Sequence, residues 1–226
     1  MSADLLIQQE EMLRLENSSR LRKHTRTSRW TRRCGICIGG VDGVWRPERL
    51  GVLALDTVGF RDLLGFVGHV PFWHNYLLRL SAPPTDAAGL HIAVLIEPYL
   101  SLVLDGKKTV ESRFGAHRQP PYQAVFAGDV ILLKRASGPI VGVACAVRTW
   151  CFPVNAATFG EIRRSIEERI CAADETFWEE RRSTRFATLI ELGEVTGVAA
   201  PLPCDKRDRR GWVTLRSRQL NLGIGL

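Results

Sequence analysis

The sequence lacks long apolar runs and a large excess of charge of one sign. No apolar stretch approaches the roughly 20 residues that a membrane-spanning helix needs, so we expect no membrane partner. The first 16 residues carry acidic side chains and no apolar leader, which argues against a secretory signal: Asp4, Glu10, Glu11 and Glu16. The sequence therefore favours a cytoplasmic protein.

The formal net charge of +7 is moderate and evenly spread. Residues 1–90 hold 12 basic and 9 acidic groups, giving +3, and residues 91–226 hold 19 and 15, giving +4. Nucleic-acid binding would therefore have to come from a local basic patch and not from overall attraction. A small ligand is equally compatible with this balance.

Cysteine is scattered and forms no metal-binding pattern. The six cysteines include one CxxC motif, Cys34 and Cys37, and its best partner pair, His69 and His74, lies more than thirty residues away. That separation exceeds the compact spacing of small zinc modules. We expect no metal and no cofactor, and a reducing compartment as the setting.

The first 85 residues have a different organisation from the rest. We expect an N-terminal extension, 1–85, and a domain at 91–220, joined by a linker at 81–85. Apolar residues between Leu5 and Leu13 predict a short amphipathic helix. Residues 20–33 carry seven cations and no acid, so they predict a basic arm that is disordered or that contacts phosphates. Residues 34–90 show no sustained hydrophobic period, and one hypothesis is that residues 1–85 are an upstream extension that packs poorly or is not normally translated.

The most informative stretch runs from residue 97 to residue 113. Residues 97–105 predict a short helix with Pro98 near its start and Gly106 as the left-handed residue that ends it. The residues after Gly106 favour a strand. Because successive side chains of a strand point to opposite faces, Thr109, Glu111 and Arg113 are expected on one face and Lys108, Val110 and Ser112 on the other. A carboxylate beside a guanidinium fits a polar ligand site or an acid/base site if this face lines a hollow. A solvated edge strand with a surface ion pair fits the same spacing.

The remaining elements predict an α+β fold. Strands are expected at 130–134, 140–147, 186–192 and 212–215. Thr158 and Glu161 have capping-box spacing at the start of a helix, and Phe159, Ile162, Ile166 and Ile170 mark one face of that helix. Asp174 predicts the cap of a second helix that runs to Trp178. Short mixed strands with two or three flanking helices fit a small mixed β-barrel.

The order of these motifs resembles a known family. Gly106, Lys108 and Arg113, with Glu111 between them, match the pattern Gly-x-Lys-x-x-x-x-Arg of the ASCH domain. The flanking segments 96–102, 128–134 and 138–142 are similar to a bacterial and archaeal branch of that family, and the resemblance covers roughly residues 91–216. It implies a barrel of the PUA-like type and, as the family was proposed to bind RNA, an RNA or nucleoside ligand beside the motif.

Two functions follow from the resemblance. In a binding module, the cations hold phosphate or a base edge, Glu111 accepts from base amino groups or orients Arg113, and the ligand-binding set is Lys107, Lys108, Glu111, Arg113, Lys134, Arg135, Lys206 and Arg210. Trp212 could stack on a base or plug the barrel end.

The second function is catalytic. Small bacterial members of the wider family hydrolyse N4-acetylcytidine with a lysine, a threonine nucleophile and a later glutamate. Lys108 matches that lysine, but Glu111 occupies the threonine position, with Thr109 two residues earlier and Glu175 as a candidate later acid. A carboxylate does not replace a hydroxyl nucleophile, although it could act as a general base toward water. Some family members have been suggested to cleave RNA, for which Lys108 and Glu111 would form the acid/base pair.

Overall fold

A computed structural model describes residues 58–82, 88–204, 206 and 209–218. The predicted helix near Leu5, the basic arm at 20–33, and Cys34 and Cys37 lie outside this part of the chain. No helix in the described part is long and apolar enough to cross a bilayer. No group of three or more His, Cys, Asp or Glu side chains among the described residues could hold a metal ion.

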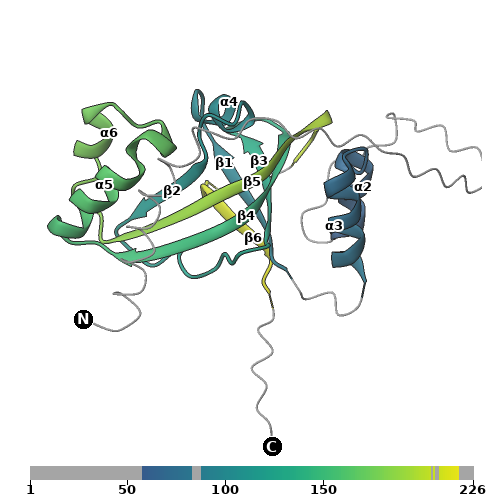
Figure 1. Cartoon of the computed structure of the whole chain (residues 1–226), viewed down its shortest axis with the longest axis horizontal. Coiled ribbons are helices and arrows are strands. Elements are labelled where there is room, and N and C mark those ends of the chain that lie inside the picture. The colour runs from purple at the N-terminus through teal and green to yellow at the C-terminus, as the bar shows by residue number, and fades with distance from the viewer. Residues whose placement is uncertain (1–57, 83–87, 205, 207–208, 219–226) are drawn as a thin grey trace, which may run out of the picture. The chain divides into compact units, whose positions relative to one another are not determined.

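The centre of the structure is a mixed six-stranded sheet (Figure 1). The strands are β1 (Leu90–Leu95), β2 (Val110–Gly115), β3 (Val130–Arg135), β4 (Ile140–Pro153), β5 (Phe186–Leu202) and β6 (Trp212–Arg216), in the order β2-β5-β4-β3-β1-β6. Only the β1–β3 pair is parallel among the described strands. The predicted α+β class and mixed sheet are confirmed, and β4 and β5 extend well beyond their expected ends.

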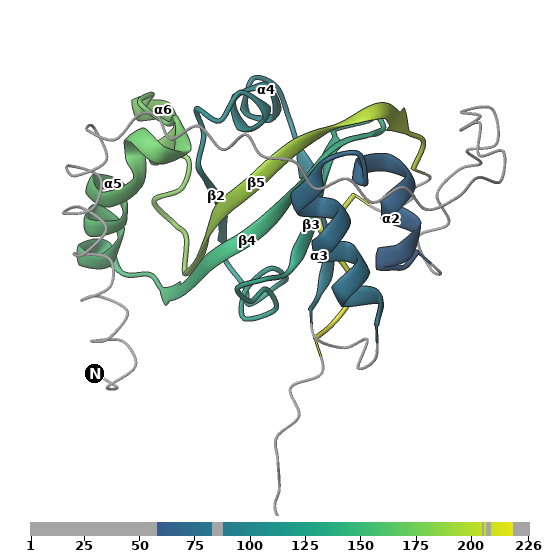
Figure 2. The same cartoon turned by 45° about the vertical axis from the view of Figure 1, so that its right-hand side comes forward.

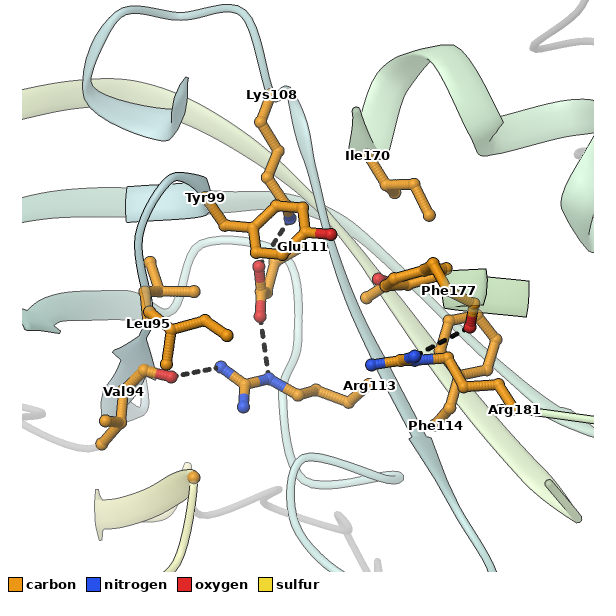
Figure 3. Close-up of a pocket in the computed structure, with 13 residues that line it drawn as sticks. Val94, Leu95, Tyr99, Lys108, Glu111, Arg113, Phe114, Ile170, Phe177 and Arg181 are labelled. Carbon is orange, nitrogen blue, oxygen red and sulfur yellow. Dashed lines mark hydrogen bonds and ion pairs between the residues drawn. The ribbon is translucent and has the colours of Figure 1, made fainter. Parts of the chain in front are cut away.

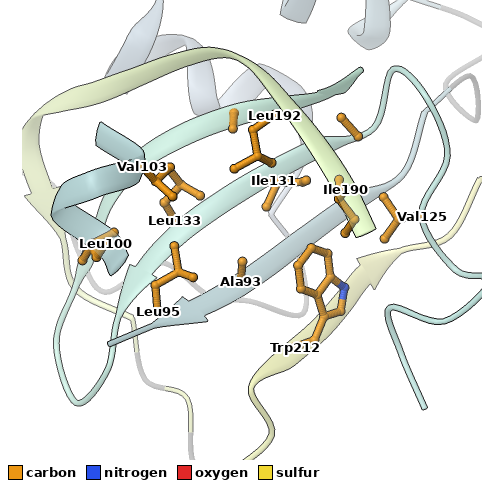
Figure 4. Close-up of a cluster of buried hydrophobic side chains, with 12 residues drawn as sticks. Ala93, Leu95, Leu100, Val103, Val125, Ile131, Leu133, Ile190, Leu192 and Trp212 are labelled. Atoms are coloured by element: carbon orange, nitrogen blue, oxygen red, sulfur yellow. The ribbon is translucent and has the colours of Figure 1, made fainter. Parts of the chain in front are cut away.

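The concave face of this sheet holds an apolar core capped by a short helix. Helix α4 (Tyr99–Leu104) places Leu100 and Val103 over buried side chains of several strands, as Figure 4 shows. Trp212 of β6 is 3% exposed and packs into this cluster, so its ring is part of the core. The predicted stop of α4 is confirmed, because Gly106 has a φ of +70°, a conformation that glycine adopts without a Cβ clash.

Two helices, α5 and α6, lie between β4 and β5 in the chain and stand beside the sheet (Figure 2). Helix α5 (Ala156–Ile170) buries Ile162, Ile166 and Ile170, as its spacing predicts, and α6 (Glu175–Glu179) is capped by Asp174. The prediction that Thr158 caps α5 is wrong. Asn155 is the cap, because its side chain accepts the backbone N–H of Thr158 at 2.9 Å.

Two further helices lie in the stretch for which the sequence predicted no fold. Helices α2 (Phe60–Val67) and α3 (Pro71–Ser81) bury Trp73 and Leu77 completely. The Trp73 indole N–H donates to the carbonyl oxygen of Glu194 in β5 at 3.0 Å. The hypothesis that the extension packs poorly is therefore wrong for these two helices.

This packing predicts a stability effect. Replacing Trp73 with Ala removes a fully buried ring and its hydrogen bond to β5, so we expect the free energy of unfolding to fall by about 3–5 kcal/mol. Urea unfolding followed by circular dichroism measures the change. His74→Ala, at an exposed position of the same helix, is the control and should alter stability by less than about 0.5 kcal/mol. Equal stability of the two variants would show that α3 does not pack as described.

Candidate functional site

Three charged side chains from one short segment meet at the start of β2 (Figure 3). The Lys108 ammonium lies 2.6 Å from Oε2 of Glu111, and Nε of Arg113 lies 2.8 Å from Oε1 of the same carboxylate. Lys108 also donates to the backbone oxygen of Val110 at 2.6 Å. We call Lys108, Glu111 and Arg113 the charged trio. The prediction that Glu111 and Arg113 are same-face neighbours agrees with this geometry.

The position of Lys108 corrects the strand alternation. Alternation placed Lys108 on the opposite face from Glu111, but β2 begins only at Val110. Lys108 lies before the strand, where the alternation of side chains does not apply, and its side chain turns toward the carboxylate. The three side chains therefore converge, although in a regular strand Lys108 would point to the opposite face from Glu111 and Arg113.

Burial and neighbouring charges shift the pKa of Glu111 in opposite directions. Burial alone would raise the pKa of the Glu111 carboxyl, but Lys108 and Arg113 outweigh it and hold that pKa below its ordinary value. The side chains of Lys108 and Glu111 are 4% and 6% exposed, and that of Arg113 is 25% exposed. The trio carries one net positive charge, and Arg113 is the member that reaches solvent most.

The trio lines a cavity of about 380 Å³. This volume lies in the range of small-ligand sites. Three aromatic side chains, from α4, β2 and α6, form much of its wall: Tyr99, Phe114 and Phe177. Arg181 adds a second guanidinium, with Cζ 3.8 Å from the centre of the Phe177 ring. The cavity thus combines flat apolar surfaces with fixed cations, as Figure 3 shows.

The cavity lies at a seam in the sheet. The strands β2 and β6 are the two edges of the described sheet and are not paired with each other. Arg113 of β2 spans this seam, because its Nη2 donates to the backbone oxygen of Val94 in β1 at 3.0 Å. Gly211, just before β6, also lines the cavity. The Arg113 side chain thus connects the edge strand β2 to β1, the neighbour of the other edge strand, and it does so at the wall of the cavity.

Four other predicted site residues point elsewhere. Thr109 accepts a hydrogen bond from Arg169 of α5 at 3.3 Å, and Lys107 is exposed beside Asp105. Lys134 donates to the backbone oxygens of Arg135 and Gly138, and so ties together the β3–β4 turn. None of Thr109, Lys107, Lys134 and Arg135 is among the described residues that line the cavity.

The later acid and the second basic cluster also lie outside the cavity wall. Glu175 is half-exposed and forms a two-pronged ion pair with Arg163, at 2.8 and 2.6 Å. Lys206 and Arg210 belong to the segment before β6, but of that segment only Gly211 lines the cavity among the described residues. The structure therefore gathers Lys108, Glu111 and Arg113 at the cavity, whereas Glu175, Lys206 and Arg210 are not among its lining residues.

The aromatic wall and Arg181 were not predicted as site residues. Phe177 lies in α6, whose cap the sequence does predict, but no local pattern indicates that its ring faces a strand some sixty residues earlier in the chain. Tyr99 precedes Gly106, the first residue of the motif, by seven residues and lies 6.3 Å, ring centre to ring centre, from Phe177. The sequence signal for this contact is limited to an aromatic residue in each of two short helices.

Comparisons with known proteins give matches among solved structures alone. No family model and no curated protein matches the chain. An ASCH protein from Zymomonas mobilis is similar over 50% of this chain and 72% of its own, with 16% identity and a TM-score of 0.41. A variant of that protein matches at 18% identity and a TM-score of 0.40, over 52% and 75% of the two chains. Protein EF3133 from Enterococcus faecalis V583 matches at 14% identity and a TM-score of 0.32, over 57% and 93%.

The coupling within the trio can be measured. Lys108→Met leaves the Glu111 carboxylate buried with one cation fewer, so we expect a loss of about 3–5 kcal/mol in the free energy of unfolding. The double variant Lys108→Met with Glu111→Leu removes both charges and should cost clearly less than the sum of the single variants. Urea unfolding of the four proteins gives this double-mutant cycle. Additive losses would mean that the two groups do not interact.

The lowered pKa of Glu111 also predicts a pH dependence. A carboxyl whose pKa is lowered by folding contributes stability above its ordinary value of 4.5, and this contribution is lost as the pH falls through the folded pKa. Wild type should therefore exceed Glu111→Gln in unfolding free energy at about pH 6, and the gap should narrow toward about pH 3. Urea titrations at each pH test this. A gap that stays constant or widens on acidification would contradict the shift.

Proposed function

We propose that this chain is an ASCH-type protein that binds RNA or a modified nucleoside in the cavity beside the charged trio. The observation that carries this proposal is the convergence of Lys108, Glu111 and Arg113 on the wall of a cavity whose other walls are aromatic. The Gly-x-Lys-x-x-x-x-Arg motif, filled by Gly106, Lys108 and Arg113, supports the family assignment.

The chemistry of the walls suits a nucleobase. A base presents two flat faces and a polar edge, and aromatic side chains and guanidinium groups stack on such faces in single-stranded RNA recognition. Tyr99 and Phe177 supply flat surfaces, and Arg181 extends the surface of Phe177. The net positive charge of the trio, together with Arg181, favours a ligand that carries phosphate.

Glu111 serves better as an acceptor than as a base in this proposal. A general base works best with a pKa near the working pH, whereas the pKa of Glu111 is held below its ordinary value by Lys108 and Arg113. The ionised carboxylate orients Arg113 and remains available to accept a hydrogen bond from a base amino group. We therefore favour binding over hydrolysis.

A hydrolase acting on acylated cytidine, or a ribonuclease, is the second candidate. The 2.6 Å contact between Lys108 and Glu111 at the cavity wall favours it, because such a pair could hold and activate a water molecule. Thr109 bonds to Arg169, away from the cavity, which speaks against its use as the nucleophile. Glu111 would then act on water, and Lys108 would stabilise the developing negative charge.

Binding and turnover distinguish the two candidates. Isothermal titration calorimetry with cytidine and with a single-stranded RNA hexamer should detect binding, and the RNA affinity should fall as salt rises. We expect Arg181→Ala to weaken RNA binding about tenfold, because a stacking surface and a cation are lost together. Arg164→Ala, at an exposed position of α5 outside the cavity wall, is the matched control.

Chromatography of N4-acetylcytidine and of the RNA after incubation tests the second candidate. The binding proposal expects both to remain intact. Turnover that is present in wild type and lost in Glu111→Gln would establish the enzyme instead. Failure of cytidine and RNA alike to bind would overturn the proposal.

A further inference from the structure

A second cavity adjoins the first across the seam of the sheet. It has a volume of about 190 Å³ and is built from the end of β2, the turn at 115–122 and the start of β5. Arg113, Phe114 and Gly211 line both cavities. The two cavities are therefore neighbours that share one wall, and Arg113 belongs to that wall.

The second cavity repeats the chemistry of the first. Tyr122 and Phe186 meet edge to face with ring centres 5.3 Å apart. Arg118 does not itself line the cavity, but its guanidinium lies 5.3 Å from the centre of the Phe186 ring and 6.0 Å from that of Tyr122, two residues that do. No acidic side chain occurs among the described residues that line this cavity. Aromatic surface with a neighbouring cation is again the combination that holds a stacked base or a phosphate.

Arg113 is held at the junction in a fixed orientation. Its Nε lies 2.8 Å from Oε1 of Glu111, and its Nη2 donates to the oxygen of Val94. Its Nη1 lies beside Gly211, where a Cβ on residue 211 would come within 2.8 Å of that nitrogen. Residue 211 must therefore be a glycine if the guanidinium is to keep this position between the two cavities.

We propose that the two cavities form adjoining subsites for consecutive nucleotides of single-stranded RNA, with Arg113 contacting the phosphate that links them. This inference rests on the proposed function and narrows it to a ligand of at least two nucleotides. One base occupies the cavity walled by Tyr99 and Phe177. The next nucleotide lies against Tyr122 and Phe186, with Arg118 beside its outer phosphate.

The proposal predicts a gain in affinity with RNA length. We expect calorimetric titrations to give an affinity for the dinucleotide CpC at least about tenfold above that for cytidine 5′-monophosphate, because one more stacked base is engaged. Cytidine, CpC and the RNA hexamer complete the series. The DNA dinucleotide dCpdC tests whether the ribose contributes.

Variants assign this gain to the second cavity. Tyr122→Leu and Arg118→Ala should each reduce the CpC affinity about five- to tenfold and leave the affinity for cytidine unchanged, because neither residue lines the first cavity. Gly211→Ala should reduce the CpC affinity as strongly through displacement of Arg113. Arg164→Ala is the control and should change neither affinity.

The outcomes separate this inference from the proposed function. Equal affinities for cytidine monophosphate and CpC, or a CpC affinity that Tyr122→Leu and Arg118→Ala leave intact, would overturn the two-subsite proposal while nucleoside binding stands. A dCpdC affinity equal to that of CpC would overturn the assignment to RNA. Absence of binding for every member of the series would overturn the proposed function itself.

Discussion

The sharing of one buried carboxylate by two cations is the interaction on which the site depends. Placing Glu111 out of water is costly unless its charge is compensated, and Lys108 and Arg113 compensate it from opposite sides at 2.6 and 2.8 Å. The result is a fixed group with a net positive charge, not a loose set of surface ions. Because Arg113 also donates to the backbone oxygen of Val94, the same residue connects the edge strand β2 to β1, the neighbour of the other edge strand.

This arrangement links the fold to the proposed ligand. The two edge strands β2 and β6 of the described sheet approach each other without pairing, and the space that pairing would have filled is occupied by Arg113, Gly211 and the two cavities. Helices α4 and α6 contribute aromatic walls on one side of Arg113, and the turn after β2 contributes them on the other. Aromatic and cationic side chains thus lie together along the seam, which is the combination on which the proposed binding of single-stranded RNA rests.

The parts of the fold and of the site that depend on a few consecutive residues could be predicted from the sequence. Gly106 ends α4, the β-branched runs form β3 and β4, and the period of two makes Glu111 and Arg113 neighbours, since each depends on a few consecutive residues. The alternation of side chains along a strand gave the wrong face for Lys108, because this residue lies just before β2. Helix α3 was missed although Trp73, Leu77 and Leu80 have helical spacing, because the run is too short to show a sustained period. The aromatic walls come from segments far apart in the chain, and no local pattern encodes their meeting.

Nuclear magnetic resonance of the Arg113 side chain tests the central claim most directly. The Nε atom of Arg113 is buried and lies 2.8 Å from the Glu111 carboxylate, so its N–H resonance should be sharp and protected from exchange with water. Addition of the single-stranded RNA hexamer should shift this resonance while that of the exposed Arg164 stays in place. Arg113 resonances that exchange freely, or that remain unchanged when RNA binds elsewhere on the protein, would contradict the account.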